Sequence, residues 1–71
     1  MSTLHDKINQ RIELLTQHWN ETVPSRVIFA RPTASVSAAM DALLEATEDT
    51  IDELLMTYTR AVYRWVESLR R

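Results

Sequence analysis

Four acidic side chains are spaced like successive turns of a helix. Asp41, Glu45, Glu48 and Asp52 are 4, 3 and 4 residues apart, which places them on one helical face. Such a ladder could bind a cation or act as an acidic docking strip that mimics phosphate. A metal site built from oxygen ligands needs convergent groups, usually with help from a loop or a histidine, and nothing in the neighbouring sequence supplies them. We therefore expect a solvated face, with the docking strip as the alternative and no bound metal or cofactor.

A second group of charged residues gives the C-terminal end a basic character. Its members are Arg60, Arg64, Arg70 and Arg71. Arginines interleaved with aromatic residues can bind nucleic acid through phosphate contacts and base stacking. On a helix, however, Trp65 points away from the arginine side, and cations are favourable at any helix C-terminus. The net charge of −2 gives no general attraction to nucleic acid, so these four arginines are candidate nucleic-acid contacts only in an alternative interpretation.

The remaining reactive side chains form no catalytic pattern. His5 and His18 are thirteen residues apart and fall on different flanks of one helix, so they cannot bind one metal within a single chain. The sequence contains no glycine and no cysteine. The absence of glycine excludes the glycine-rich phosphate loop and the Gly-x-Ser-x-Gly turn of a nucleophilic serine. We predict that the protein is not an enzyme.

Size and composition favour one small helical domain covering residues 1–71. With 45% hydrophobic and 25% charged residues, the chain has an ordinary globular composition. A chain this short without disulfides relies on good helix packing or on oligomerisation. The absence of glycine disfavours tight β-hairpins. The N-terminus lacks the pattern of a signal peptide and no stretch is apolar enough to span a membrane, so we expect a cytoplasmic protein that does not bind membranes.

The first helix is predicted over residues 3–21. Its apolar residues follow helical spacing and form one stripe: Leu4, Ile8, Ile12, Leu15 and Trp19. Ser2 or Thr3 can cap this helix. Pro24 disfavours the helical conformation of the residue before it, so the helix should end by about Thr22.

The second helical segment is predicted over residues 34–70. Positions alternating 4 and 3 apart form a heptad pattern: Met40, Leu44, Thr47, Ile51, Leu54, Tyr58, Ala61, Trp65 and Ser68. This pattern favours one continuous helix. The alternative is a break near residues 47–50, because Thr50 and Glu53 resemble the capping box that begins a new helix.

The two alternatives predict different assemblies. A helix over 34–70 would be ~55 Å long against ~28 Å for the first helix. Such an all-α helical hairpin would leave apolar surface of the long helix uncovered, and a homodimeric helix bundle would bury it. With a break near residues 47–50, a three-helix monomer becomes feasible instead.

The connector over residues 22–33 is longer than most connections between packed helices. It contains the apolar run Val27, Ile28 and Phe29 between two prolines, and these residue types favour extended backbone. The run is interpreted first as a lid over the open end of the helices. The alternatives are a strand that pairs with another sheet edge, and an extended peptide that enters a partner's groove.

Taken together, the sequence predicts a small non-enzymatic regulator that binds another protein and blocks or bridges it. Small acidic helical chains of bacterial or phage origin provide the analogy, which rests on general shape. The predicted partner surface combines the connector with the C-terminal helix: Val27, Ile28, Phe29, Tyr58, Val62, Trp65, Val66 and Leu69. Trp19 and Trp65 fit the core first and an interface second. The alternative function is a dimeric nucleic-acid-binding regulator that uses the arginines of the C-terminal helix.

Overall fold

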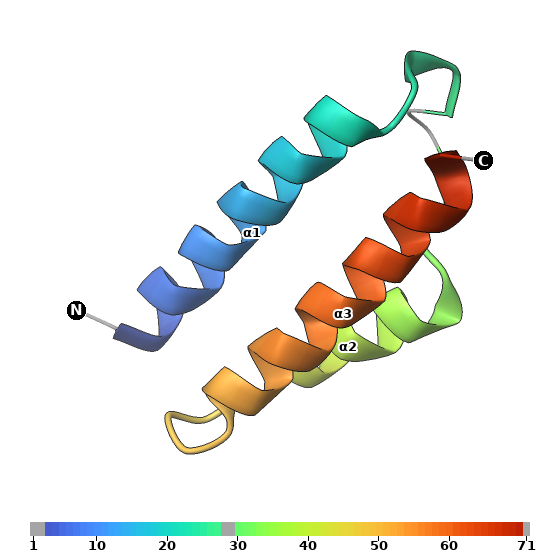
Figure 1. The fold of residues 1–71 in the computed structure, drawn as a ribbon. Coiled ribbons are helices and arrows are strands. Elements are labelled where there is room, and N and C mark those ends of the chain that lie inside the picture. The colour runs from blue at the N-terminus through green and yellow to red at the C-terminus, as the bar shows by residue number, and fades with distance from the viewer. Residues whose placement is uncertain (1–2, 28–29, 71) are drawn as a thin grey trace.

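The computed structural model describes residues 3–27 and 30–70, and every regular element in these ranges is helical (Figure 1). The elements are, in order, α1 (Thr3–Thr22), the short 3-10 helix η1 (Ser25–Val27), α2 (Ala34–Leu44) and α3 (Ile51–Arg70). The predicted all-α fold class is confirmed for this part of the chain. None of its helices has the length and apolar character needed to span a membrane.

Helix α1 follows its predicted bounds to within one residue. The N–H of Val23 donates to the carbonyl of Trp19 at 2.8 Å, which closes the last turn just before Pro24. Leu15 is buried, and Leu4 and Trp19 are partly buried against the same core. Ile12, predicted to belong to this stripe, lies at its edge and is exposed.

The predicted continuous helix over 34–70 is not observed, because α2 ends at Leu44 and α3 begins at Ile51. The break therefore matches the alternative prediction. The N–H of Thr47 donates to Oγ1 of Thr50 at 3.0 Å, and the N–H of Ile51 donates to the carbonyl of Thr47 at 2.9 Å. A side chain that bonds back to the backbone three residues earlier is one half of a capping box. The predicted position is right, but the observed bonds join Thr47 and Thr50 rather than Thr50 and Glu53.

Helix α3 is the centre of the fold. Helices α1 and α3 run in the same direction, while α2 runs in the opposite direction, and α1 and α2 each pack against α3 (Figure 1). Six of the ten buried hydrophobic residues belong to α3. The buried residues form one cluster: Leu15, Val36, Ala39, Leu43, Ile51, Leu55, Tyr58, Ala61, Val62 and Val66.

The break changes the argument for a homodimer. Tyr58, Val62 and Val66 belong to the predicted partner surface, which needs them exposed on a long helix, but each is buried within the chain. They are covered because the turn over residues 45–50 folds α2 back against α3. The apolar surplus on which the dimer prediction rested is therefore absent at these three residues, and a dimer would need another surface.

The connector is turned rather than extended over residues 25–27. Val27 lies in η1, and its N–H donates to the carbonyl of Pro24 at 3.1 Å. The prediction of extended backbone is thus wrong at Val27. Ile28 and Phe29, the other two residues of the apolar run, lie outside the described residues. The connector ends at Thr33, whose Oγ1 accepts the N–H of Val36 at 3.4 Å and so caps α2.

Candidate binding surfaces

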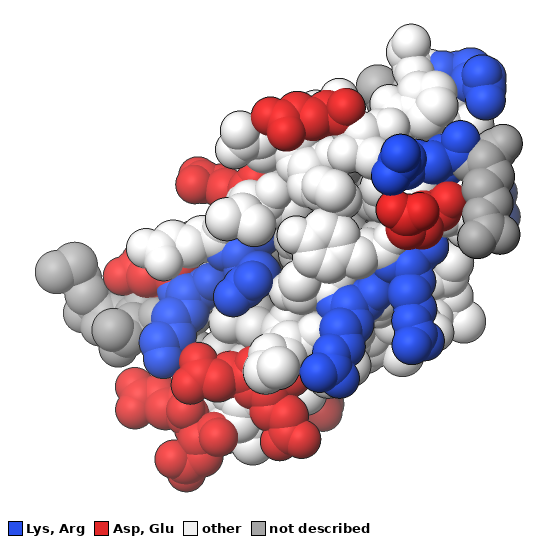
Figure 2. Space-filling view, viewed as in Figure 1, with Lys and Arg blue, Asp and Glu red and all other residues white. Residues whose placement is uncertain are grey.

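The charged side chains are unevenly distributed along the molecule. Six of the ten acidic residues fall between positions 41 and 53. Figure 2 shows acidic side chains gathered at the end of the molecule that holds the α2–α3 turn, with basic side chains further along. Because of this uneven charge, the end that holds the α2–α3 turn favours a positively charged binding partner, and the basic part favours a negatively charged one.

The predicted acidic ladder is divided by the break between helices. Asp41 lies on α2, Glu45 and Glu48 lie in or beside the turn, and Asp52 lies on α3. Asp52 is 3.5 Å from Nζ of Lys7 in an exposed ion pair. Among the described residues, no group of three or more acidic, histidine or cysteine side chains is arranged to hold a metal ion.

The two histidines occupy different environments. The ring of His18 makes an edge-to-face contact with Tyr63 at 4.6 Å between centroids, and its Nδ1 is 3.5 Å from Oγ1 of Thr22. His5 lies near the other end of α1, beside a groove described next. The structure does not bring the two histidines together.

An apolar groove lies between α1 and α2, with α3 beneath it. It arises because both helices pack mainly on α3 rather than on each other. The groove has a volume of about 510 Å³. Its lining is largely hydrophobic: Leu4, His5, Ile8, Asn9, Ile12, Met40, Asp41, Leu43, Leu44, Ala46 and Tyr58.

The walls of this groove expose large hydrophobic side chains. Leu44 is 85% exposed and Met40 is 47% exposed on the α2 wall, and Ile12 is exposed on the α1 wall. Met40 and Leu44 belong to the predicted heptad pattern. Because α2 ends at Leu44, this pattern does not continue into α3, and the two side chains are not buried in the core. Exposed apolar residues that line a single groove, unlike isolated ones, indicate an interaction surface.

The polar residues of the groove are few. His5 and Asn9 line it from α1, and Asp41 lines it from α2. Tyr58 contributes its ring from α3, and burial raises the pKa of its phenol above the ordinary value of 10.0, so it is neutral at physiological pH. The acidic turn begins directly after Leu44, which gives this end of the groove a negative rim.

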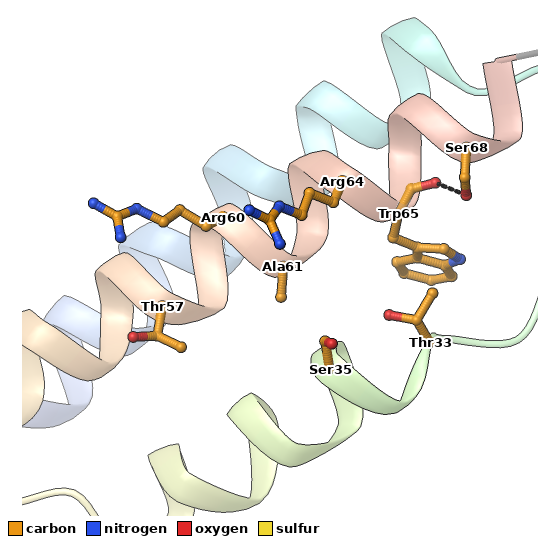
Figure 3. A pocket seen from close by; sticks show the side chains of 8 residues that line it. All are labelled: Thr33, Ser35, Thr57, Arg60, Ala61, Arg64, Trp65 and Ser68. Atoms are coloured by element: carbon orange, nitrogen blue, oxygen red, sulfur yellow. Dashed lines mark hydrogen bonds between the residues drawn. The ribbon is translucent and has the colours of Figure 1, made fainter.

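A polar cleft lies on another side of α3, where the first turn of α2 approaches it (Figure 3). It has a volume of about 460 Å³. Its lining residues come from the two helices and the cap of α2: Thr33, Ser35, Thr57, Arg60, Ala61, Arg64, Trp65 and Ser68. We call it the arginine cleft.

The structure separates the described candidate nucleic-acid contacts into two groups. Arg60 and Arg64 line the arginine cleft. Arg70 instead pairs with Glu67 on its own helix, with 3.1 Å between Nη1 and Oε1. Arg71 lies outside the described residues.

The predicted partner surface is also divided. Trp65 and Leu69 are partly buried, and Trp65 packs against Trp19. Val27 is partly buried in η1. The described members of this set therefore form no continuous exposed surface. The groove residues Ile12, Met40 and Leu44 were not predicted as a site. The position of Leu44 directly before the acidic segment could have indicated that Leu44 belongs to a binding surface.

Comparison with protein-family models, with curated proteins and with solved structures finds no match to this chain. The functional argument therefore rests on the geometry of the groove and of the arginine cleft.

Proposed function

We propose that this chain is a small, non-enzymatic, cytoplasmic regulator that binds another protein by receiving an amphipathic helix in the groove between α1 and α2. The observation that carries the proposal is the groove itself, in which Ile12, Met40 and Leu44 expose apolar side chains on facing walls. This keeps the predicted class of function but moves the binding surface from the connector and α3 to the groove.

The shape of the groove favours a helix as its occupant. Two helices that lie on a third leave between them the position that a fourth helix fills in a four-helix bundle. Amphipathic helices bind such grooves through apolar residues at positions i, i+3 or i+4, and i+7. Helix α2, which forms one wall, has 11 residues and is therefore ~16 Å long. A partner helix of about three turns matches that length.

The charges around the groove favour a basic helix. Asp41 lines the groove, and Glu45 and Glu48 follow at the end where α2 stops. Positive side chains flanking the apolar face of the incoming helix would complement these carboxylates. Complementary charge of this kind contributes to the association rate and to the choice of partner more than to affinity.

A second copy of the chain is the competing occupant, and it would restore the predicted homodimer. Two copies that face each other in parallel through this groove would bring their acidic rims close together, which disfavours that arrangement. Nucleic acid is less well supported, because among the three predicted arginines that the structure describes, Arg60 and Arg64 line the cleft whereas Arg70 pairs with Glu67.

The proposal is tested with two synthetic peptides of 12 residues that share a leucine face and differ in their flanking residues, lysine in one and glutamate in the other. Backbone amide resonances are followed by NMR during titration. We expect the lysine peptide to bind more tightly and to shift the amides of Ile12, Met40 and Leu44. Leu44→Ser should abolish this binding.

The matched control is Met56→Ser, which removes an exposed apolar side chain of α3 outside the groove. It should bind the lysine peptide normally. Binding that is unaffected by Leu44→Ser would contradict the proposal. A dimer in sedimentation that Leu44→Ser dissociates would assign the groove to a second copy and also overturn it.

A further inference from the structure

We propose that the arginine cleft binds a phosphate monoester through Arg60 and Arg64 on α3 and through hydroxyl donors on the first turn of α2. This site lies apart from the groove and does not depend on the proposed helix partner. The first argument concerns the two arginines. They are four residues apart, so they lie on the same side of α3 and on one wall of the cleft.

Both arginines are available for a ligand. They are exposed, and within residues 3–27 and 30–70 neither makes an ion pair. Figure 3 shows the guanidinium of Arg64 lying over Ala61 and that of Arg60 extending along the helix in the same direction. None of the described residues that line the cleft is acidic. The cleft thus holds two positive charges without an internal counter-charge.

The opposite wall supplies further donors. Oγ1 of Thr33 accepts the N–H of Val36, so its hydroxyl proton remains free to donate. Ser35 lies on the same turn and faces α3 across the cleft in Figure 3. Thr33 and Ser35 therefore place two hydroxyl donors on the wall opposite the arginines.

The other two hydroxyls of the cleft have a different role. Thr57 donates its hydroxyl proton to the carbonyl of Glu53 at 3.1 Å, and Ser68 donates to the carbonyl of Trp65 at 2.7 Å. Both bonds keep these hydroxyls turned to their own helix. The donors available to an anion are consequently the two arginines with Thr33 and Ser35.

This donor set suits a phosphate better than a carboxylate. A carboxylate has two oxygens in one plane, whereas a phosphate monoester has three terminal oxygens in a tetrahedral arrangement and carries about −1.5 to −2 charge at neutral pH. Arginine binds phosphate oxygens in a bidentate manner through its planar fork of N–H groups. A phosphate therefore accepts hydrogen bonds from more donors and from more directions than a carboxylate does.

The aromatic residue of the cleft favours an isolated phosphate group over a nucleic-acid strand. Base stacking needs a free aromatic face. The ring of Trp65 packs against Trp19 at 4.3 Å between centroids, and Figure 3 places Thr33 beside it. The arginines of the cleft therefore act without a stacking platform.

The test is a titration of the protein with inorganic phosphate at constant ionic strength, with chloride as the matched salt, followed by NMR of backbone amides. We expect saturable shifts at Ser35, Ala61 and Arg64 with phosphate and none with chloride. Arg64→Gln should weaken binding at least tenfold, and Ser35→Ala should weaken it severalfold. The control Arg26→Gln, an exposed arginine of η1 outside the cleft, should bind normally.

Two results would overturn the proposal. One is a phosphate response that does not saturate or that persists unchanged in Arg64→Gln. The other comes from a parallel titration with an eight-nucleotide DNA strand that carries no terminal phosphate. If that strand binds more tightly than inorganic phosphate and its binding also falls in Arg26→Gln, the cleft is part of a wider nucleic-acid surface. An intact helical far-ultraviolet circular dichroism spectrum for each variant separates loss of binding from loss of fold.

Discussion

The indole rings of Trp19 and Trp65 pack against each other with 4.3 Å between centroids and 42° between their planes. This contact joins the C-terminal halves of α1 and α3. The groove lies at the other half of α1, between Leu4 and Ile12. The tryptophan pair thus holds α1 against α3 at one end and leaves the groove open toward the acidic turn.

Truncation of Trp65 should destabilise the protein more than truncation of Trp19. Both rings are partly buried, but Trp65 also lines the arginine cleft and lies beside Thr33 at the start of α2. We expect Trp65→Ala to lower the free energy of unfolding by about 2–3 kcal/mol, less than the ~3–5 kcal/mol typical of a fully buried aromatic side chain. Urea denaturation measures both variants.

A double-mutant cycle isolates the contact between the two rings. With the double variant included, the coupling free energy should be about 0.5–1.5 kcal/mol, as for other aromatic pairs. Strictly additive effects would mean that the rings stabilise the fold independently, contrary to the observed geometry.

The hydroxyl of Thr50 should stabilise the start of α3. Thr50→Ala removes the acceptor for the Thr47 N–H, and caps of this kind contribute about 1 kcal/mol. We expect a loss of about that size in thermal or urea unfolding. Thr57→Ala is the control, because its hydroxyl bonds to a carbonyl of its own helix and caps nothing.

The same turn decides between the two predicted architectures. Thr47→Ala combined with Thr50→Ala removes both hydroxyls and introduces the strongest helix former at each position. If these residues hold the break, the double variant should shift toward a continuous helix, uncover Val62 and Val66, and form dimers in sedimentation. A monomer of unchanged helicity would show that the packing of α2 on α3 maintains the break without the threonines.

The helices were predictable because their signals are local. The stripe of α1 and the proline that follows it fix that helix within a residue of its observed end. The position of the break was predictable only as an alternative. Thr47 occupies a position of the heptad pattern, so the 4 and 3 spacing of that pattern continues through the break and favours one continuous helix. The packing of Val36, Ala39 and Leu43 in the core with α3 is a tertiary interaction that the spacing along the chain does not show.

The groove was not predictable from the same pattern. Ile12 and Leu44 satisfy helical spacing as well as the residues that are buried, and only the relative position of three helices leaves them exposed. Arg60 and Arg64 were identified from residue type, but their cleft depends on the first turn of α2, which lies far away in sequence. In both sites the missing information is the approach of α2 to α3.

Tyr58 should make stability fall at alkaline pH. Burial raises the pKa of its phenol in the folded protein above 10.0, whereas the unfolded chain ionises near the ordinary value. Below that value both states are protonated and the phenol's stabilising contribution is complete. As the pH rises beyond the ordinary value, Tyr58 loses its proton more readily in the unfolded chain than in the folded protein. Ionisation therefore favours the unfolded chain, and the stabilising contribution of the phenol is lost.

Thermal unfolding between pH 8 and 11 measures this effect. The melting temperature of Tyr58→Phe should fall less steeply than that of the parent protein above pH 10. Equal slopes for the parent and Tyr58→Phe would contradict a phenol buried beneath the groove.

Adjacent leucines at the end of α2 should respond very differently to truncation. Leu43 is 7% exposed and belongs to the core, whereas Leu44 is 85% exposed on the groove wall. We expect Leu43→Ala to lower the free energy of unfolding by about 2–4 kcal/mol, as for other buried leucines. Leu44→Ala should change it by about 0.5 kcal/mol or less, as for surface positions. Urea denaturation of the two variants gives both values, and equal losses would show that α2 presents a different face to α3, which would remove the α2 wall of the groove.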